Sequence, residues 1–596
     1  MVLQRGAPIR MNGKAAPGDL VTVKMDGATC TVTASTSDGT WACELPAKDA
    51  SGEPAEVTVS SSSGESITLT DVLIGDVFFC SGQSNMQLSV LQTMNGPEEA
   101  ANASAWADML RSVYVALDDS YFNVSEPQED FIPSWAWART TSDKAGDVSA
   151  VCFYHAKELL RASSSSSSSS LLVGASGGVV PIGIISSSWG GTAIQPWMPE
   201  EAIAQCSDDD SRAAKKMTTT KKNSKAKAGR RGVTSNTNPD PGLGFGGHRS
   251  GGGGGAGDCL VPCVDSTLYN SMVAPFTHLP VAGWLWYQGE ANVGSADSYA
   301  CLFPAMIDGW RKAWSANTAG AQDAIAAAAA APFVFAQVSS WPNGGDNSAI
   351  PLLRESQEAP LFSLANVAMA VAADIGDPAS AFHPIHPPYK QELARRMALQ
   401  TTRIQSSIND NKNKNKNKNK NKNKRLSRTK GANASNDVID DDDDDDVLII
   451  PSGGPRPVSV VVDNWNESWG DYHVGYGGNG NNYCSMFSCL GVRVTFDQPV
   501  AARSSYGLQY GFGEGGFELL SALDCGSECD FQPAVFTGIL DSDARTVQLN
   551  VTWVYSEAPL ALRYAWRDYP NMPLTNGAPF DLPAPPFRMS LVEQHD

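Results

Sequence analysis

The sequence predicts an α/β protein in which a mostly parallel sheet, covered by helices, is flanked by a β-rich domain at each end. Stretches that alternate apolar and polar residues fill residues 1–70, continuous apolar runs follow, and short β segments with Gly and Pro turns return after residue 448. Alternation is typical of half-buried strands, whereas continuous apolar runs are typical of parallel strands buried on both faces.

The N-terminal β domain is expected over residues 1–70. Val21–Val23 and Ala55–Val59 alternate apolar with polar residues, and Gly and Asp separate such stretches. This pattern predicts a small β-sandwich-like domain with no chemistry of its own.

The catalytic α/β domain is expected over residues 71–403. Its sheet is predicted from six continuous apolar runs: Val72–Phe79, Val113–Leu117, Ile182–Ile185, Val281–Tyr287, Phe333–Val338 and Val367–Ala373. The longer segments between these runs leave room for the helices that cover a parallel sheet.

A second β domain is expected over residues 448–596. Its short apolar segments are Val458–Val462, Val492–Phe496, Val547–Val554 and Leu560–Tyr564. Gly and Pro turns between these segments predict antiparallel β structure rather than a continuation of the parallel sheet.

Several segments have low complexity. Two inserts, at about 162–170 and 208–257, interrupt the catalytic domain, and a linker over 404–447 carries the alternating tract Asn411–Lys424 and the acidic run Asp440–Asp446. Such compositions bury too little apolar surface to offset chain entropy, which predicts solvated segments. Polyanion binding by the Lys tract and calcium binding by the Asp tract are the functional alternatives.

Composition limits the partners of this 596-residue chain. A net charge of -20 and a pI near 4.8 argue against a nucleic-acid partner, because binding a polyanion requires a clustered basic surface. The sequence contains no apolar run of about 18 residues, so we expect no membrane-spanning segment. A small-molecule or glycan substrate is the remaining expectation.

The twelve cysteines indicate an oxidising compartment. They include the close pairs Cys259/Cys263, Cys484/Cys489 and Cys525/Cys529, and no histidine flanks these pairs at zinc-ligand spacing, which favours disulfides over zinc. Asn-x-Ser/Thr acceptors, which predict a glycoprotein on a secretory route (extracellular or lysosome-like), occur at Asn102, Asn123, Asn433, Asn466 and Asn550. Residues 1–10 lack an apolar signal core and resemble domain sequence, so we expect an incomplete N-terminus.

The strongest local signal is Gly75–Met86, where an apolar strand runs into a tight polar turn and a helix is expected to follow. This arrangement presents the Ser84 hydroxyl at the carboxyl end of a parallel strand, where open α/β sheets bind ligands. The turn lacks the closing glycine of the G-x-S-x-G nucleophile elbow. The alternative is that Ser84 only caps the helix.

Four ordered motifs carry a family resemblance. Gly82–Met86 resembles the first block of the SGNH hydrolases, in the form found in sialate O-acetylesterases and related carbohydrate acetylesterases. The supporting stretches are Trp189–Thr192 with Trp197, Trp286–Asn292, Ile385–Pro387 with Lys390, and, outside the motifs, Met1–Arg5 and Arg563–Trp566. The resemblance implies an SGNH-hydrolase-like three-layer domain and a serine esterase that removes acetyl groups from O-acetylated sialic acids.

A serine hydroxyl needs a neighbouring imidazole to take its proton, and His386, in its Ile-His-Pro setting, is the predicted base for Ser84. A carboxylate should orient the imidazole. Asp377 is the first candidate and Asp374 the second, because both follow an apolar strand; either residue could instead merely start a turn. The commoner SGNH pattern has aspartate three residues before the histidine, where this chain has His383.

The oxyanion of the tetrahedral intermediate requires preorganised donors. The predicted donors are the backbone N–H of Ser84, a backbone N–H of Gly190 or Gly191, and the side-chain amide of Gln288, with Asn292 as its substitute. Taken alone, the Gly-Gly pair could be an ordinary turn.

Trp189, Arg354 and Asn292 are the predicted substrate-binding residues. Aromatic faces stack on sugar rings, and an arginine can bind a sugar carboxylate, although large aromatics often belong to the core, as could Trp197, Trp286 and Tyr287. No metal or organic cofactor is expected. The alternatives are an esterase acting on acetylated xylan or another plant or algal glycan, and a non-catalytic carbohydrate-binding protein on an esterase scaffold.

Overall fold

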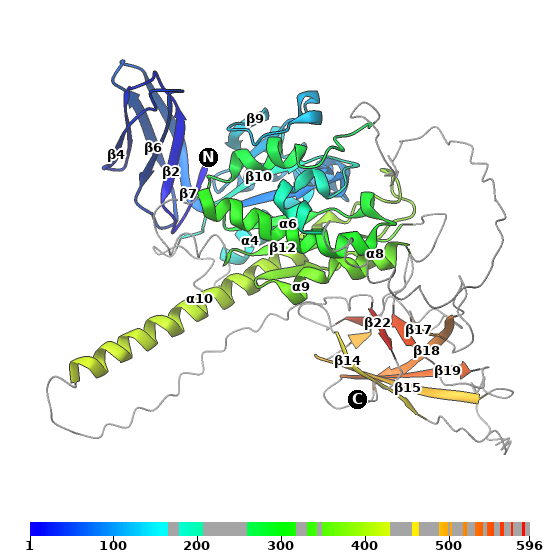
Figure 1. Cartoon of the computed structure of the whole chain (residues 1–596). Helices are drawn as coiled ribbons and strands as arrows, with labels where there is room; N and C mark the ends of the chain where they lie inside the picture. The colour runs from blue at the N-terminus through cyan, green and yellow to red at the C-terminus, as the bar shows by residue number, and fades with distance from the viewer. Residues whose placement is uncertain are drawn as a thin grey trace, which may run out of the picture.

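The computed structural model of the chain describes residues 1–164, 178–206, 259–317, 330–341 and 349–428, together with the strands between 456 and 590 and a few adjoining residues. Figure 1 shows the N-terminal strands, the helix-covered sheet and the C-terminal strands in this order along the chain. The insert at 208–257, the run Asp440–Asp446 and most of the insert at 162–170 lie outside the described residues.

The central sheet has the strand order β13-β12-β11-β7-β10-β8-β9. Its strands are β13 (Val367–Ala370), β12 (Phe333–Ala336), β11 (Gly283–Tyr287), β7 (Ser66–Gly82), β10 (Ile182–Ser188), β8 (Leu110–Val115) and β9 (Pro133–Arg139). All pairings from β13 to β8 are parallel, and the edge strand β9 is antiparallel to β8. The six predicted apolar runs coincide with the six parallel strands.

The N-terminal strands join this sheet through β7. The strands are β1 (Val2–Gln4), β2 (Ile9–Lys14), β3 (Leu20–Met25), β4 (Ala28–Thr33), β5 (Thr40–Leu45) and β6 (Ser51–Ser61). Strands β3, β4 and β6 add antiparallel pairings, so the whole sheet is mixed, and β2 pairs separately with β5. Because the seventeen residues of β7 cross the boundary predicted at residue 70, one strand serves both the N-terminal region and the central sheet. The β-sandwich-like arrangement predicted for the ends of the chain stays a prediction.

Helices cover both faces of the central sheet (Figure 1). Successive residues of a strand point to opposite faces. Leu285 and Tyr287 of β11 therefore pack in one apolar cluster with α4 (Ala150–Ser164) and α10 (Lys390–Arg428). Trp284 and Trp286 pack in the other cluster with α6 (Ala296–Asn317) and α8 (Ala349–Gln357). Because of this alternation, the domain has one apolar core on each face of the sheet.

Shorter helical elements connect the strands. They are α1 (Ser84–Gln87), η1 (Val90–Gln92), α2 (Gly96–Ala101), η2 (Ala103–Trp106), η3 (Asp119–Asn123), α3 (Ser142–Ala145), η4 (Gln195–Trp197), η6 (Tyr269–Val273), η7 (Ala274–Phe276), η8 (Glu290–Asn292), α9 (Ala359–Ser363) and η9 (Ala373–Ile375). Of these, α1, η8 and η9 follow strand ends or lie close to them, and they carry much of the polar sequence of the motifs.

Helix α10 continues through the Asn411–Lys424 tract, which lies in the predicted linker. Its first turns pack against α4 and the sheet through Leu393, Met397 and Ile404. Once a helix is nucleated, each added residue costs little, so the packed half can extend the helix into a tract with no apolar face. Figure 1 shows this second half projecting beyond the rest of the domain.

The C-terminal strands form an antiparallel sheet in the order β14-β15-β19-β18-β17-β20-β22. They are β14 (Pro457–Asp463), β15 (Ser488–Phe496), β17 (Phe517–Leu520), β18 (Phe531–Ile539), β19 (Thr546–Trp553), β20 (Ala561–Tyr564) and β22 (Phe587–Ser590), with the pair β16 (Ala501–Ala502) and β21 (Leu574–Thr575) apart from them. The antiparallel character agrees with the short apolar segments of the sequence.

Disulfides within the described residues join Cys30 to Cys43, Cys80 to Cys152, Cys206 to Cys301, and Cys259 to Cys263. The last of these confirms one predicted close pair, whereas the pairs Cys484/Cys489 and Cys525/Cys529 lie outside the residues whose side chains are described. Disulfides are typical of proteins that mature in an oxidising compartment. Among the described helices, none has the length and apolar content needed to cross a membrane.

Candidate active site

The turn after β7 places Ser84 at the carboxyl edge of the sheet. Gly82 has φ +140°, and a Cβ at this position would lie 2.1 Å from the backbone oxygen of Tyr287, so only glycine fits between β7 and β11. The chain then starts α1 at Ser84, and the N–H of Gln83 donates to Tyr287 O at 3.0 Å. As the first residue of the helix, Ser84 has a backbone N–H with no partner inside the helix.

The strand register brings the other motifs beside this turn. Gly82 pairs in register with Ser188 of β10 on one side and with Tyr287 of β11 on the other. The residues that follow these strands, including Gly190 and Gln288, therefore lie on either side of the Ser84 turn. Parallel strands bring distant motifs to one edge because all their carboxyl ends point the same way.

His386 contacts Ser84 directly. Its Nε2 lies 2.8 Å from Ser84 Oγ, although 302 positions separate the two residues. Burial lowers the pKa of the imidazole below its ordinary value of 6.5, and the positive charges of Lys390 and His383 lower it further, while the bond to the Phe382 carbonyl opposes these effects. A neutral imidazole at this distance can accept the serine proton.

The second nitrogen of His386 is bound by a backbone carbonyl. Nδ1 lies 2.7 Å from the oxygen of Phe382. A carbonyl oxygen can only accept, so Nδ1 must carry the hydrogen, which leaves Nε2 as the acceptor facing Ser84. The Phe382 carbonyl thus fixes the tautomer that a general base requires.

The structure gives the two candidate acids other partners. Asp377 Oδ1 accepts from the N–H of Ala379 at 2.9 Å, and among the described residues it makes no bond to His386. The side chain of Asp374 is fully buried and forms a bidentate ion pair with Arg396 at 2.6 and 2.8 Å. The expectation that Asp377 orients the base therefore differs from the observed contact, because its carboxylate caps its own turn while the histidine loop supplies a carbonyl.

A tight turn delivers that carbonyl. His383 has φ +77°, in the left-handed region that a non-glycine residue rarely occupies, and its oxygen accepts from His386 N at 2.8 Å. Ser380 Oγ donates to the oxygen of His386 at 2.6 Å. Strained backbone of this kind persists where the surrounding structure holds it, and here it curls the chain so that Phe382 O faces the imidazole.

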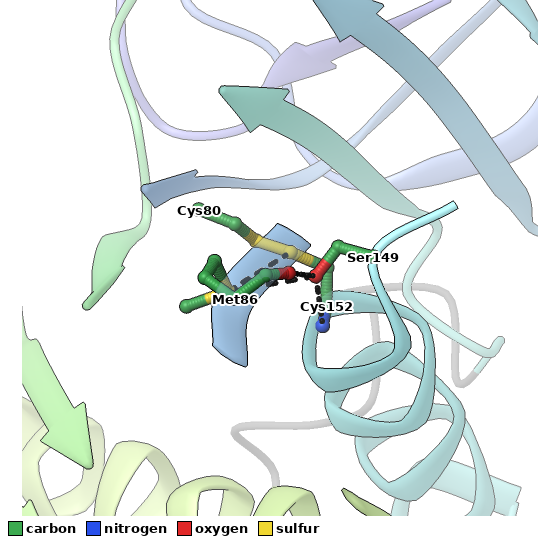
Figure 2. The surroundings of a disulfide bond; sticks show 4 residues. All are labelled: Cys80, Met86, Ser149 and Cys152. Carbon is green, nitrogen blue, oxygen red and sulfur yellow. Dashed lines mark hydrogen bonds between the residues drawn. A yellow bond between two sulfur atoms is a disulfide. The ribbon is translucent and has the colours of Figure 1, made fainter. Parts of the chain in front are cut away.

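The strand and the turn on either side of Ser84 are bound to α4 and to the residue before it. Figure 2 shows Cys80 of β7 bonded to Cys152 of α4, with Met86 and Ser149 beside the disulfide. Ser149 Oγ donates to Met86 O at 2.6 Å, so the residue two positions after Ser84 is bound to the start of this helix. These contacts limit how far the nucleophile turn can move relative to the sheet.

Gly190, one of the predicted oxyanion donors, lies close to Ser84. A Cβ on Gly190 would lie 3.2 Å from Ser84 Cβ, so glycine permits the close approach. The Gly190 N–H donates to Gln87 Oε1 at 2.7 Å, which identifies Gln87 as a neighbour that the sequence reasoning missed. Gly191 has φ +77°, a conformation suited to glycine, and its backbone lies beside this position.

The side-chain amide of Gln288, a predicted oxyanion donor, makes hydrogen bonds within the domain. Its side chain is fully buried, and its Nε2 lies 2.7 Å from Asn292 Oδ1 and 3.1 Å from Thr192 O. Its Oε1 accepts from the hydroxyl of Tyr299 at 3.0 Å. Asn292 Oδ1 also accepts from Ile194 N at 3.0 Å, so the two amides join the second and third motifs rather than pointing freely at Ser84.

The predicted substrate contacts are mostly enclosed. Trp189 is 9% exposed and packs edge-on against Phe122, while Trp197 and Trp286 are fully buried, which supports the packing interpretation for those two. Arg354 is also fully buried, and it donates to the carbonyl oxygens of Val338 and Ser339 at 3.1 and 3.0 Å. The guanidinium group of Arg354 therefore binds backbone carbonyls inside the domain.

Comparison with known proteins gives a consistent family likeness. No family profile matches the sequence. The chain is 30% identical over 425 residues to the sialate O-acetylesterase of Homo sapiens, covering 67% of this chain and 68% of that protein. It is 31% identical over 365 residues to the sialate O-acetylesterase of Rattus norvegicus, covering 58% of this chain and 60% of that protein, which is less than two thirds of its length. The crystal structure of a carbohydrate acetylesterase from Xanthomonas citri is similar in fold, with a TM-score of 0.63 and 25% identity over 99% of this chain and 97% of that one.

Proposed function

Because the chain belongs to the sialate O-acetylesterase family, we propose that it hydrolyses O-acetyl esters on carbohydrates through an acetyl-Ser84 intermediate. The chain is homologous to carboxylic ester hydrolases. The substrate and the acetyl-Ser84 intermediate are what we propose for this chain. The observation that supports it most is the 2.8 Å contact between Ser84 Oγ and His386 Nε2 at the carboxyl edge of the sheet.

The first half of the proposed reaction acylates the enzyme. Ser84 Oγ attacks the acetyl carbonyl carbon while His386 Nε2 takes the hydroxyl proton, and the carbonyl oxygen becomes an oxyanion. The tetrahedral intermediate collapses, the bond to the sugar oxygen breaks, and His386 returns the proton to that oxygen. The Phe382 carbonyl supports the imidazolium between these steps, because it accepts the Nδ1 hydrogen throughout.

The second half releases acetate. A water molecule gives a proton to His386 Nε2 and attacks the acetyl-Ser84 carbonyl, and collapse of the new intermediate breaks the ester and returns the proton to Ser84 Oγ. We assign oxyanion stabilisation to the N–H groups of Ser84 and of Gly190 or Gly191. For Gly190 this requires the Gln87 side chain to leave the N–H that it occupies at 2.7 Å.

The names of the curated relatives favour O-acetylated sialic acids as the substrate class. One observation favours the second candidate, an acetylated neutral glycan such as xylan. Arg354, the residue nominated to bind a sugar carboxylate, is fully buried and donates to backbone carbonyls. Trp189, with its 9% exposure, is the remaining candidate for a sugar contact in either case.

Replacement of the nucleophile tests the reaction. Ser84→Ala should abolish acetate release from p-nitrophenyl acetate, because among the described residues Ser84 supplies the hydroxyl that is hydrogen-bonded to His386 Nε2. Thermal unfolding of the variant should match that of the parent chain, since the change removes one oxygen atom. Unchanged turnover in Ser84→Ala would reject Ser84 as the nucleophile, whereas no acetate release by the parent chain would favour a non-catalytic carbohydrate-binding protein.

The sugar is decided by a direct comparison of substrates. Acetate release from an O-acetylated sialic acid should exceed release from acetylated xylooligosaccharides at equal ester concentration. Equal rates, or a preference for the xylooligosaccharides, would move the assignment to the neutral glycan while leaving the chemistry of Ser84 intact.

A further inference from the structure

A buried polar network lies directly behind Ser84 and His386. It consists of Asn85 after the nucleophile, Glu290 in η8 after β11, and Lys390 at the start of α10. Asn85 has no exposed surface, Glu290 is 7% exposed and Lys390 is 1% exposed. Buried charges are costly unless they are paired, so a Lys and a Glu retained here require an explanation.

Asn85 connects the two halves of the catalytic pair. Its Nδ2 donates to Glu290 Oε1 at 2.5 Å and to the carbonyl oxygen of Ile385 at 2.9 Å. Ile385 immediately precedes His386, and Asn85 immediately follows Ser84. One amide group therefore joins the chain next to the nucleophile to the chain next to the base, across 300 positions of sequence.

Lys390 completes the bridge from the other side. Its Nζ donates to Asn85 Oδ1 at 2.6 Å and lies 5.1 Å from the centre of the Tyr287 ring. Burial lowers the pKa of Lys390 to about 7 and raises the pKa of Glu290, and each charge opposes the shift of the other. The amide of Asn85 is thus oriented by the Glu290 carboxyl group at its NH₂ end and by the Lys390 amino group at its oxygen.

We propose that Asn85 is a positioning residue for the esterase reaction, and that Glu290 and Lys390 orient its amide so that the Ile385 carbonyl, and with it His386, stays in reach of Ser84. The inference rests on the proposed function. The Glu290 carboxylate accepts a side-chain hydrogen bond from Asn85 at Oε1, and it also interacts with its own backbone N–H and with the charge of Lys390.

The sharpest test keeps the size of the side chain and removes its donor. Asn85→Asp has the same shape, but its carboxylate faces Glu290 Oε1 and the Ile385 carbonyl without a hydrogen to donate. We expect kcat for p-nitrophenyl acetate to fall about 10²-fold, the loss typical of a misplacement of about 1 Å, with little change in KM. A parent-like kcat in folded Asn85→Asp would overturn the proposal.

The two charged residues provide a second test that tolerates a poorly folding Asn85 variant. Lys390→Met leaves a buried carboxylate uncompensated, whereas the double variant Glu290→Gln/Lys390→Met removes both charges and keeps an acceptor oxygen near Asn85. We expect kcat of the double variant to recover at least partly from that of Lys390→Met. Equal loss in both variants would contradict the orienting role of the charge pair.

Lys157→Met provides the matched control. Lys157 of α4 is also a largely buried lysine paired with a glutamate, Glu99, but neither residue belongs to the network behind Ser84. Its loss should lower the free energy of unfolding without changing kcat of the folded protein. A kcat loss in Lys157→Met equal to that in Lys390→Met would show a general effect of buried lysines and would overturn the assignment.

A second readout separates this inference from the proposed function. The rate at which a fluorophosphonate labels Ser84 reports activation of the hydroxyl without any sugar ester. If the parent chain is labelled but releases no acetate from acetylated sugars, the substrate proposal fails, while slower labelling of Asn85→Asp still supports the positioning role. Equal labelling rates in the parent and Asn85→Asp would refute that role.

Discussion

The same motifs supply residues to the apolar interior of the central sheet and to the polar contacts at its carboxyl edge. Within the third motif, Trp286 and Tyr287 are fully buried in the two apolar clusters, whereas Gln288 and Glu290, just past the end of β11, enter polar networks. Tyr287, in an apolar cluster, and Gln288, in a polar network, are adjacent in the sequence. Proximity in sequence to a catalytic residue therefore says little about contact with substrate.

The tryptophans of the motifs belong to the interior of the sheet. Trp286 packs edge-on against Trp310 at 5.5 Å and against Trp197 at 6.1 Å, so two motif tryptophans contact each other inside the core. Aromatic pairs of this geometry add stability beyond the area that they bury. Trp286 lies close to the site because β11, the strand that carries it, ends at the site, and Trp197 reaches it from η4.

The largest expected effect falls on the carboxyl edge. His386→Ala should lower kcat about 10² to 10⁴-fold, because the serine loses the group that takes its proton. Stability should change little, since the imidazole is only partly buried. Steady-state kinetics with p-nitrophenyl acetate and thermal unfolding measure the two quantities. If His386→Ala lost stability but kept its turnover, His386 would be a packing residue and not the base for Ser84.

The interior should respond in the opposite way. Trp286→Ala should lower the free energy of unfolding by roughly 3 to 5 kcal/mol, because it removes a fully buried indole from the larger apolar cluster. The kcat per folded molecule should remain near that of the parent, as counted by fluorophosphonate titration. A selective loss of kcat at unchanged stability would place this indole in the site and not in the core.

The two aspartates near His386 should differ in the same way, with Asp374 affecting stability and Asp377 affecting neither stability nor kcat strongly. Asp374→Asn breaks the buried pair with Arg396 and should cost roughly 3 kcal/mol of stability. Asp377→Asn removes a turn cap and should leave kcat within a few-fold of the parent, because Nδ1 is bound by Phe382 O. Denaturant unfolding and kinetics separate the two outcomes. A loss of kcat in Asp377→Asn as large as that in His386→Ala would restore the carboxylate as the orienting acid.

The sequence predicted the features that depend on side-chain pattern. The apolar runs located six strands, and the motifs at their ends identified Ser84 and His386, which the fold brings within 2.8 Å. The Phe382 carbonyl was not predictable, because every residue has a carbonyl and its direction depends on the left-handed turn at His383. The ion pair of Asp374 and the burial of Arg354 escaped for a related reason, since a charged residue type does not reveal its partner.

The smallest expected effect concerns pH. His386 acts as a base only when neutral, and burial together with neighbouring positive charge lowers its pKa below 6.5. The acid limb of kcat/KM should therefore lie at lower pH than an ordinary imidazole would give, and kcat/KM should fall about tenfold per pH unit below the pKa of His386 in the free enzyme. His383→Asn removes one of those positive charges and keeps a residue that tolerates φ +77°, so the pKa of His386 should rise and the acid limb should move to higher pH. A profile that stays fixed in His383→Asn would show that His383 does not affect the pKa of the base, and a shift to lower pH would contradict the contact geometry from which the effect is inferred.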